Sequence, residues 1–250
     1  PGADSAVAAP VARLSQRREA RFLDWLADGT LLIATRLGPT EQLHRVSAPL
    51  GMRAQLSYFG DAVVAAAAQP YSNESVAVLK HAGGAEPTLH LLRLDNHEAR
   101  ALVDERARPG PALWAHDGKR LVFSGRQRNG RDADLYLLDV AGAGLPQLVA
   151  AASGELRALD WSLDDRQLLA VRRDAVNGDQ LQLIELASGT LRSIDPPAPD
   201  DPDRRRVLQA RFAPGEDVLV FLDVRPRDGT LSVAGLDAGK WTLAAGVGER

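Results

Sequence analysis

A repeat of about 47 residues constrains the fold of this chain more than any other feature of its sequence. The first half of the repeat is an aromatic residue followed by Asp-Gly and leucine, and its clearest copies begin at Trp25 and Trp114. The copy at Trp161 has Asp165 in place of glycine, and the copy at Phe212 is the weakest. A period of this length is typical of solenoids and propellers, whose units bury their apolar faces only against neighbouring units.

The second half of each repeat is a strand of alternating apolar residues, followed by a turn and another strand. These strands are expected at residues 42–46, 89–94, 135–140, 181–186 and 231–236. With Leu43, Leu91, Tyr136, Leu183 and Val233 as register marks, the steps are 48, 45, 47 and 50 residues. Short strands at even spacing, separated by turn signals, indicate an all-β array.

The turns of the first half define two further strands in each repeat. Asp28-Gly29 and Asp117-Gly118 supply the positive φ of a tight hairpin turn at low steric cost. The segments after them, 31–35 and 121–124, are continuously apolar, as expected of strands that are covered on both faces. The sequence therefore predicts a β-propeller of four-stranded antiparallel blades, with about five blades present in either a small closed ring or an incomplete one.

The predicted blades cover residues 21–250, after an arm or linker at residues 1–20. The aromatic residue at the head of each repeat is expected to pack between neighbouring blades. The head of the second repeat is degenerate, and we place it at Tyr58-Phe-Gly-Asp61. A proline-rich, charged segment at 195–206 is expected to be a loop. The approximate blade boundaries are 21–57, 58–106, 107–153, 154–195 and 207–250.

Composition excludes several classes of function. The chain has no cysteine, so a disulfide frame, a zinc-thiolate site and a cysteine nucleophile are excluded. A formal net charge of −3 gives no reason to expect a nucleic acid as partner. The longest apolar run, 62–68, is far too short to span a bilayer, and no signal peptide is recognised. The small residues at 1–10 would suit a mature N-terminus after cleavage or the start of a domain cut from a longer protein, and the sequence alone does not choose between them. A periplasmic or secreted location is slightly favoured over a cytoplasmic one.

Two stretches of sequence resemble a known family. The segments 22–25, 32–36, 42–46 and 49–59 look like the N-terminal β-propeller of prolyl-oligopeptidase-type serine peptidases, the S9 group. The stretch 114–124, followed by 128–136, is similar to the middle blades of the same propellers. That second stretch equally resembles the blades of TolB-type propellers, and the resemblance fades beyond Pro197.

The resemblance implies an accessory domain. In S9 peptidases the propeller covers a C-terminal α/β-hydrolase domain that carries the catalytic serine, aspartate and histidine. No Gly-x-Ser-x-Gly elbow occurs in this chain, so the chain alone is predicted to be inactive and its parent protein to be a serine peptidase. The expected partners are that hydrolase domain in cis and peptide substrates. The alternative is a stand-alone TolB-like propeller that serves as a protein-interaction scaffold.

Few residues are left as candidates for chemistry of their own. Arg126, Arg128 and Arg131 form a small basic cluster on one predicted loop, and we identify them as possible contacts to a partner domain or a peptide carboxylate. Asp132 and Asp134 are expected to fix a blade turn rather than to bind calcium. The five histidines show no spacing that suggests a zinc site. No cofactor, metal ligand or catalytic residue is assigned.

Overall fold

The structure is a computed structural model that describes residues 19–84, 86–103, 105–142, 144–174, 178–194, 206–212, 219–224, 231–237 and 240–247. For the last three strands it describes the backbone alone. The expected arm at residues 1–20 therefore lies almost wholly outside the described residues, and so do the proline-rich loop and the turn of the weakest repeat, at 213–218.

Five antiparallel sheets of four strands make up the described chain, and in each sheet the strands follow their order in the sequence. The first sheet contains β1 (Ala20–Trp25), β2 (Leu31–Thr35), β3 (Gln42–Val46) and β4 (Arg53–Gln55). The second contains β5 (Val63–Ala68), β6 (Ser75–His81), β7 (Pro87–Arg93) and β8 (Ala99–Ala101). The third contains β9 (Ala112–Trp114), β10 (Arg120–Gly125), β11 (Asp134–Asp139) and β12 (Gln147–Ala150). The fourth contains β13 (Glu155–Trp161), β14 (Gln167–Asp174), β15 (Gly178–Glu185) and β16 (Thr190–Ser193). The fifth contains β17 (Arg206–Phe212), β18 (Leu219–Val224), β19 (Leu231–Asp237) and β20 (Lys240–Val247).

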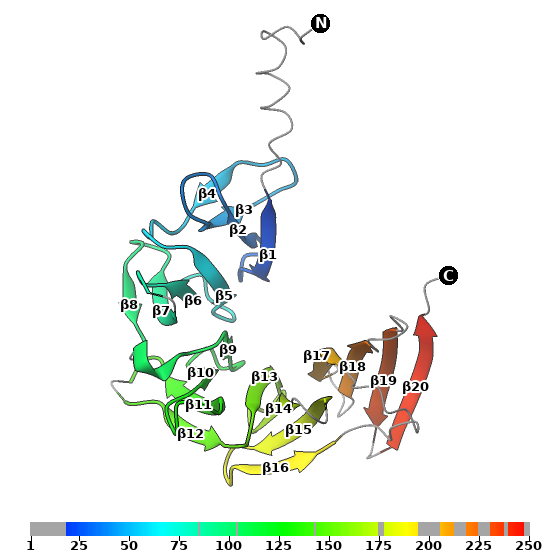
Figure 1. The fold of residues 1–250 in the computed structure, drawn as a ribbon. Coiled ribbons are helices and arrows are strands. Elements are labelled where there is room, and N and C mark those ends of the chain that lie inside the picture. The colour runs from blue at the N-terminus through cyan, green and yellow to red at the C-terminus, as the bar shows by residue number, and fades with distance from the viewer. Residues whose placement is uncertain are drawn as a thin grey trace, which may run out of the picture.

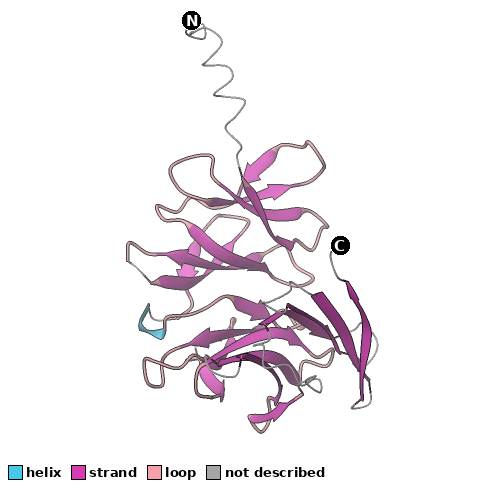
Figure 2. Cartoon of the chain, turned by 45° about the vertical axis from the view of Figure 1, so that its right-hand side comes forward, coloured by secondary structure: helices cyan, strands magenta, loops and turns pink. Residues whose placement is uncertain are grey.

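The sheets follow one another around an arc, with the first and the fifth at its two ends (Figure 1). The first strand of each sheet lies innermost, because β1, β5, β9, β13 and β17 contact one another in that order. Strands dominate the described chain, and a single 3-10 turn at Glu105–Ala107 is its one helical element (Figure 2). The predicted fold class, an all-β propeller of four-stranded blades, is confirmed.

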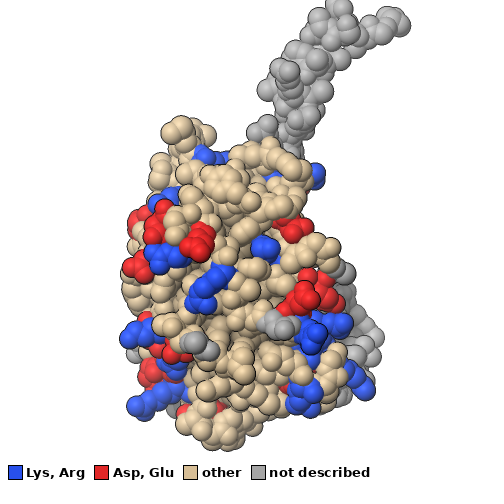
Figure 3. Space-filling view, turned by 90° about the vertical axis from the view of Figure 1, so that its left-hand side faces the viewer, with Lys and Arg blue, Asp and Glu red and all other residues tan. Residues whose placement is uncertain are grey.

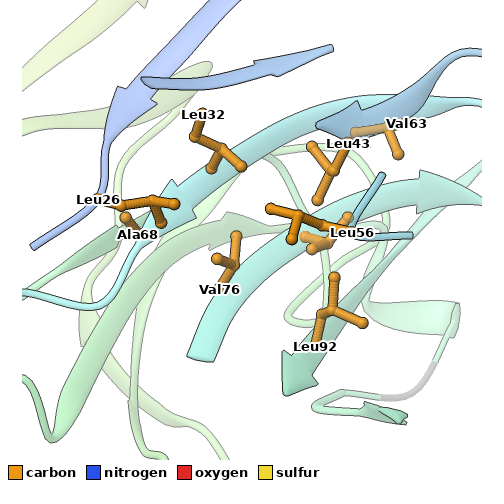
Figure 4. Close-up of a cluster of buried hydrophobic side chains, with 9 residues drawn as sticks. Leu26, Leu32, Leu43, Leu56, Val63, Ala68, Val76 and Leu92 are labelled. Carbon is orange, nitrogen blue, oxygen red and sulfur yellow. The ribbon is translucent and has the colours of Figure 1, made fainter. Parts of the chain in front are cut away.

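Each pair of neighbouring sheets buries an apolar layer between them. In the layer between the first two sheets, Leu26, Leu32, Leu43 and Leu56 meet Val63, Ala68, Val76 and Leu92 (Figure 4). β10 lies in a blade with a neighbour on each face, which explains why it is a nearly continuous apolar run. β2 is also buried along nearly its whole length, although its sheet lies at the end of the arc (Figure 1). The burial of these strands confirms the prediction that they are covered on both sides.

The turns between the first and second strands behave as their sequences indicate. Gly29 and Gly118 have φ values of 78° and 65°, which an L side chain rarely adopts. A Cβ atom at Gly118 would also lie 3.2 Å from the carbonyl oxygen of Pro70, in the turn between β5 and β6. Asp165 occupies the same position in the fourth sheet and adopts φ 54° without being glycine.

The predicted head of the second repeat is wrong. Tyr58 and Asp61 lie in the connection between the first and second sheets, before β5 begins. The residue that pairs as Trp25 and Trp114 do is Ala68, opposite Val76. This blade has an alanine where the others have an aromatic ring, so its strand ends without the expected sequence signal.

Candidate binding site at the axial end of the first three sheets

A pocket of about 470 Å³ lies where the innermost strands of the first three sheets end. Asp24 and Trp25 line it from β1, Gln69 and Tyr71 from the turn after β5, and Trp114 from β9. We call this the axial pocket. Three of these five residues are aromatic, so the walls are mainly apolar, and Trp25 and Tyr71 are largely exposed there.

Hydrogen bonds between blades fix the shape of the axial pocket. The indole N–H of Trp114 donates to the carbonyl oxygen of Ala67 at 3.0 Å, and the Gln69 amide donates to the carbonyl oxygen of Gly118 at 2.8 Å. The side-chain oxygen of Gln69 is buried and has no hydrogen-bond partner. Gln69 therefore keeps a buried acceptor without a partner next to the pocket, while its amide N–H joins the second and third sheets.

Asp24 joins the first two sheets next to the pocket. One carboxylate oxygen accepts the backbone N–H of Trp25 at 2.8 Å, and the other accepts that of Ala68 at 2.9 Å. Asp160 makes the equivalent bond at the junction of the fourth and fifth sheets, where it accepts the N–H of Phe212 at 2.8 Å. In both places an aspartate that directly precedes the aromatic residue of its strand serves as a link to the next blade.

Tyr71 is a conformational outlier at the mouth of the pocket. Its φ of 56° lies in the left-handed region, where an aromatic residue is strained, and its side chain is exposed. Such strain persists only where the surrounding structure holds the residue in place, and it concentrates at functional sites. Tyr71 is therefore the most unusual residue of the pocket.

Asp165 links the third and fourth sheets. Its buried carboxylate accepts the backbone N–H groups of His116 and Asp117, each at 2.9 Å, and the His116 ring N–H at 2.8 Å. The Arg120 guanidinium lies 3.7 Å away and also pairs with Asp117. Burial alone would raise the pKa of Asp117, but the backbone N–H of Lys119 and the Arg120 side chain lower it below its ordinary value.

The histidine at this junction does not form a catalytic triad. His116 hydrogen-bonds to Asp165, and no hydroxyl group within the described residues bonds to its other ring nitrogen. Ser162, in the neighbouring turn, donates instead to Asp164 at 2.7 Å. In the part of the chain that the structure describes, no three His, Cys, Asp or Glu side chains are placed to hold a metal ion.

The structure places the three arginines of the predicted contact site on the loop between β10 and β11. Arg128 binds Asp134 at 2.7 Å and Asp132 at 3.3 Å, and its hydrogen bond to Asp134 raises the pKa of Arg128 above its ordinary value. The Arg126 side chain donates to the carbonyl oxygen of Arg131. The cluster exists, but two of its three side chains are engaged within their own loop, and whether it contacts a partner stays a prediction.

Asp132 and Asp134 have the structural role that their sequence context predicts. Asp132 accepts the N–H of Gly154 at 2.9 Å, and Asp134 accepts that of Ala152 at 3.2 Å. Hydrogen bonds from the Asn129 side chain and the Gly154 N–H lower the pKa of Asp132. Both carboxylates thus tie the third sheet to the segment that leads into the fourth.

Fold and site together define a class of protein, a β-propeller with an aromatic pocket at its axis and no catalytic triad in the described residues. No model of a known protein family and no curated protein matches the chain. Solved structures do match it. TolB from Acinetobacter baumannii has a TM-score of 0.67 at 15% identity and covers 92% of this chain. A prolyl endopeptidase has a TM-score of 0.67 at 14% sequence identity, and the match covers 90% of this chain. An oligogalacturonate lyase in complex with manganese has a TM-score of 0.69 at 13% sequence identity, and the match covers 91% of this chain.

These likenesses establish the fold and nothing narrower, because one fold hosts unrelated functions. The expected similarity to TolB and S9 propellers is confirmed at that level. The chain spans 55% of the TolB chain, 36% of the prolyl endopeptidase chain and 66% of the lyase chain. None of the described residues forms a helix long and apolar enough to cross a membrane.

Sequence reasoning missed Gln69 and Tyr71. The repeat itself contained the signal, because one period after Trp25 and one period before Trp114 both fall near residues 67–72. The search for an aromatic head drew attention to Tyr58 instead. The second repeat is recognised by its spacing, since its residue types at that position differ from those of the other blades.

Proposed function

We propose that this chain is a non-catalytic propeller that controls the access of peptides to an α/β-hydrolase domain. The observation that carries the proposal is the axial pocket, which lies at the innermost strands, where a peptide moving along the propeller axis would meet it. The likeness to the prolyl endopeptidase supports the proposal, because it includes 90% of this chain.

The mechanism would be steric and positional. An extended peptide offers side chains for the exposed aromatic surfaces of Trp25 and Tyr71. A folded protein would not fit at the innermost strands, so the propeller would admit short or unfolded chains and exclude others. Catalysis is left to the partner domain, since the conspicuous side chains of the repeat already serve as links between blades.

Peptide binding tests the role of the pocket. Fluorescence anisotropy of a short, fluorescein-labelled, proline-containing peptide is measured with the wild-type chain, with Tyr71→Ala and with the control Leu163→Ala. Loss of one aromatic contact should weaken binding about tenfold, the equivalent of about 1.4 kcal/mol. Leu163 is an exposed apolar residue in the turn after β13, so its replacement should leave the affinity unchanged. Equal affinities for wild type and Tyr71→Ala would contradict a peptide site here.

The proposal that this chain is itself non-catalytic is tested with a serine-hydrolase probe. The chain alone should not react with a fluorophosphonate, and stoichiometric labelling would show that it has its own nucleophile. The likeness to TolB, which includes 92% of this chain, favours a second candidate, a stand-alone interaction scaffold. A reading frame that continues beyond codon 250 into a Gly-x-Ser-x-Gly elbow supports the peptidase, whereas a stop codon there supports the scaffold.

A further inference from the structure

The third sheet has a neighbouring sheet on each side, so the exposure of its side chains does not depend on the ends of the described chain. Phe123 packs toward the second sheet, and Leu135 packs toward the fourth. The first sheet differs, because no described sheet precedes it. Trp25 is 59% exposed there, whereas Trp114 and Trp161 are buried between sheets. The expectation that every head aromatic packs between blades is therefore wrong for Trp25.

The outermost strand of the third sheet, β12, is an exposed apolar edge. Leu148 lies on this strand and is 49% exposed, and Leu145, just before the strand, is 87% exposed. Val149 is partly buried against the core that the third and fourth sheets share, so the strand is held in place. We call residues 145–150 the outer edge.

The outer edge is also free of charge. No charged residue occurs between positions 140 and 154. On the side of the molecule where β8 and β12 lie (Figure 1), charged side chains gather toward the two margins of the lower blades, with mostly uncharged surface between them (Figure 3). An exposed apolar strip without charge is typical of a surface that binds another protein chain.

The other outermost strands whose side chains the structure describes each carry an exposed arginine. β4, β8 and β16 contain Arg53, Arg100 and Arg192. A charged side chain hinders an edge strand from pairing with the same strand of another molecule, because two like charges would then lie side by side. β12 lacks this protection, and no described strand pairs with its outer side.

We propose that β12 pairs antiparallel with β12 of a second copy of this chain. The two third sheets would then join into one continuous sheet, held by main-chain hydrogen bonds between the two edges. An edge that pairs with itself in this way is self-complementary and closes as a two-fold dimer. Leu148 of one copy would meet Leu148 of the other, and Leu145 would extend the apolar contact.

The uncharged edge favours a second copy over a charged segment of another protein. A charged strand would find no opposite charge on the outer edge, whereas a second copy supplies a strand of equal length that is equally uncharged. Because β12 is short, we expect a weak dimer that forms only at high protein concentration. Dimerisation would leave the axial pocket open, because the pocket lies at the innermost strands and β12 is the outermost one.

Sedimentation velocity between about 1 and about 300 µM tests the proposal, which does not depend on peptide binding. The wild-type chain should pass from monomer to dimer over that range. Leu148→Lys places two ammonium groups opposite each other and should weaken dimerisation at least about tenfold. The matched control is Leu163→Lys, because Leu163 is 59% exposed but lies in the turn after β13, away from any outermost strand. This control should dimerise like the wild type.

A disulfide cross-link tests the pairing of the strands directly. The chain has no cysteine, so a single introduced thiol can link only to the same position of a second copy. Opposed residues of antiparallel strands have Cα atoms about 4.5–5.5 Å apart, which is within the range of a disulfide. Oxidation of Leu148→Cys, or of Gln147→Cys if the two-fold axis lies one residue earlier, should give a linked dimer on a non-reducing gel. Leu163→Cys should stay monomeric.

Four results would overturn the proposal: a wild-type monomer at every concentration, association that persists in Leu148→Lys, equal loss of association in Leu163→Lys, and no cross-linked dimer from either cysteine variant of β12. Far-ultraviolet circular dichroism checks that each variant is folded. Tyr71→Ala should leave dimerisation unchanged, so failure of the peptide-binding proposal and failure of this one remain distinguishable.

Discussion

Replacing Asp165 by glycine sets two structural effects against each other. Glycine is the residue that the first and third repeats have at this turn position, and it would relieve the left-handed backbone of φ 54°. That relief should stabilise the fold by about 1–2 kcal/mol. The same substitution removes the carboxylate that accepts the backbone N–H groups of His116 and Asp117.

The loss should exceed the gain. Each buried backbone donor left without an acceptor costs about 1–3 kcal/mol, which amounts to about 2–6 kcal/mol for two. The side chains of His116 and Arg120 are partly exposed and can turn to water, so their bonds to Asp165 add little. Subtracting the relief of backbone strain leaves a net destabilisation with a midpoint of about 2.5 kcal/mol, within a range of about 0–5 kcal/mol.

Urea unfolding gives the difference in free energy of unfolding between Asp165→Gly and the wild type. Tryptophan fluorescence reports the transition, because Trp161 ends the strand just before the turn that contains Asp165. The control is Asp139→Ala. The Asp139 carboxylate is exposed and accepts N–H groups only within its own hairpin, from Ala141 and Gly142, so its loss should cost at most about 1 kcal/mol. An Asp165→Gly variant as stable as the wild type would refute the reasoning, since it would mean that backbone strain outweighs the link between blades.

Burial lowers the pKa of His44, and burial together with Lys80 lowers that of His90, so both histidines are protonated more readily in the unfolded chain. Stability should therefore fall as the pH drops below about 6.5, and His44→Gln should reduce the fall, as measured by thermal unfolding between pH 8 and 5. Trp114→Phe removes a hydrogen bond between blades and should cost about 1 kcal/mol in urea unfolding, whereas Trp25→Phe should cost less, because that indole has no such bond. Tyr71→Gly should raise the free energy of unfolding by about 1 kcal/mol by relieving its positive φ, and a decrease would show that the ring stabilises the fold.

Most of the fold could be predicted from the sequence because each blade is formed by residues that are close to one another in the sequence. Its four strands are consecutive and are joined by short turns, so alternation of apolar residues and the Asp-Gly pairs indicate each hairpin directly. The second blade shows the limit of this reasoning, since Ala68 replaces the aromatic residue and only the spacing of the repeat identifies the strand end.

Most residues of the candidate site could not be predicted from the sequence. The axial pocket combines residues of three blades, and the Gln69 amide is held by a hydrogen bond to Gly118, 49 residues away. The loop with Arg126, Arg128 and Arg131 shows the opposite case. The cluster is conspicuous in the sequence, but in the structure Arg128 forms an ion pair with Asp134 of the same hairpin. No local pattern distinguishes an arginine that is free to contact a partner from one that is paired in its own loop.

The sequence by itself determined the number and the kind of blades, because strand periodicity and turn chemistry depend on residues a few positions apart. Only the tertiary structure decided what the repeated side chains do, since each depends on the blade about 47 residues before or after it. Trp25 and Trp114 have the same sequence context, yet one is exposed and the other is buried against Ala67. The physical reason is that a blade buries its faces against its neighbours, so a residue's role depends on whether the described chain supplies that neighbour.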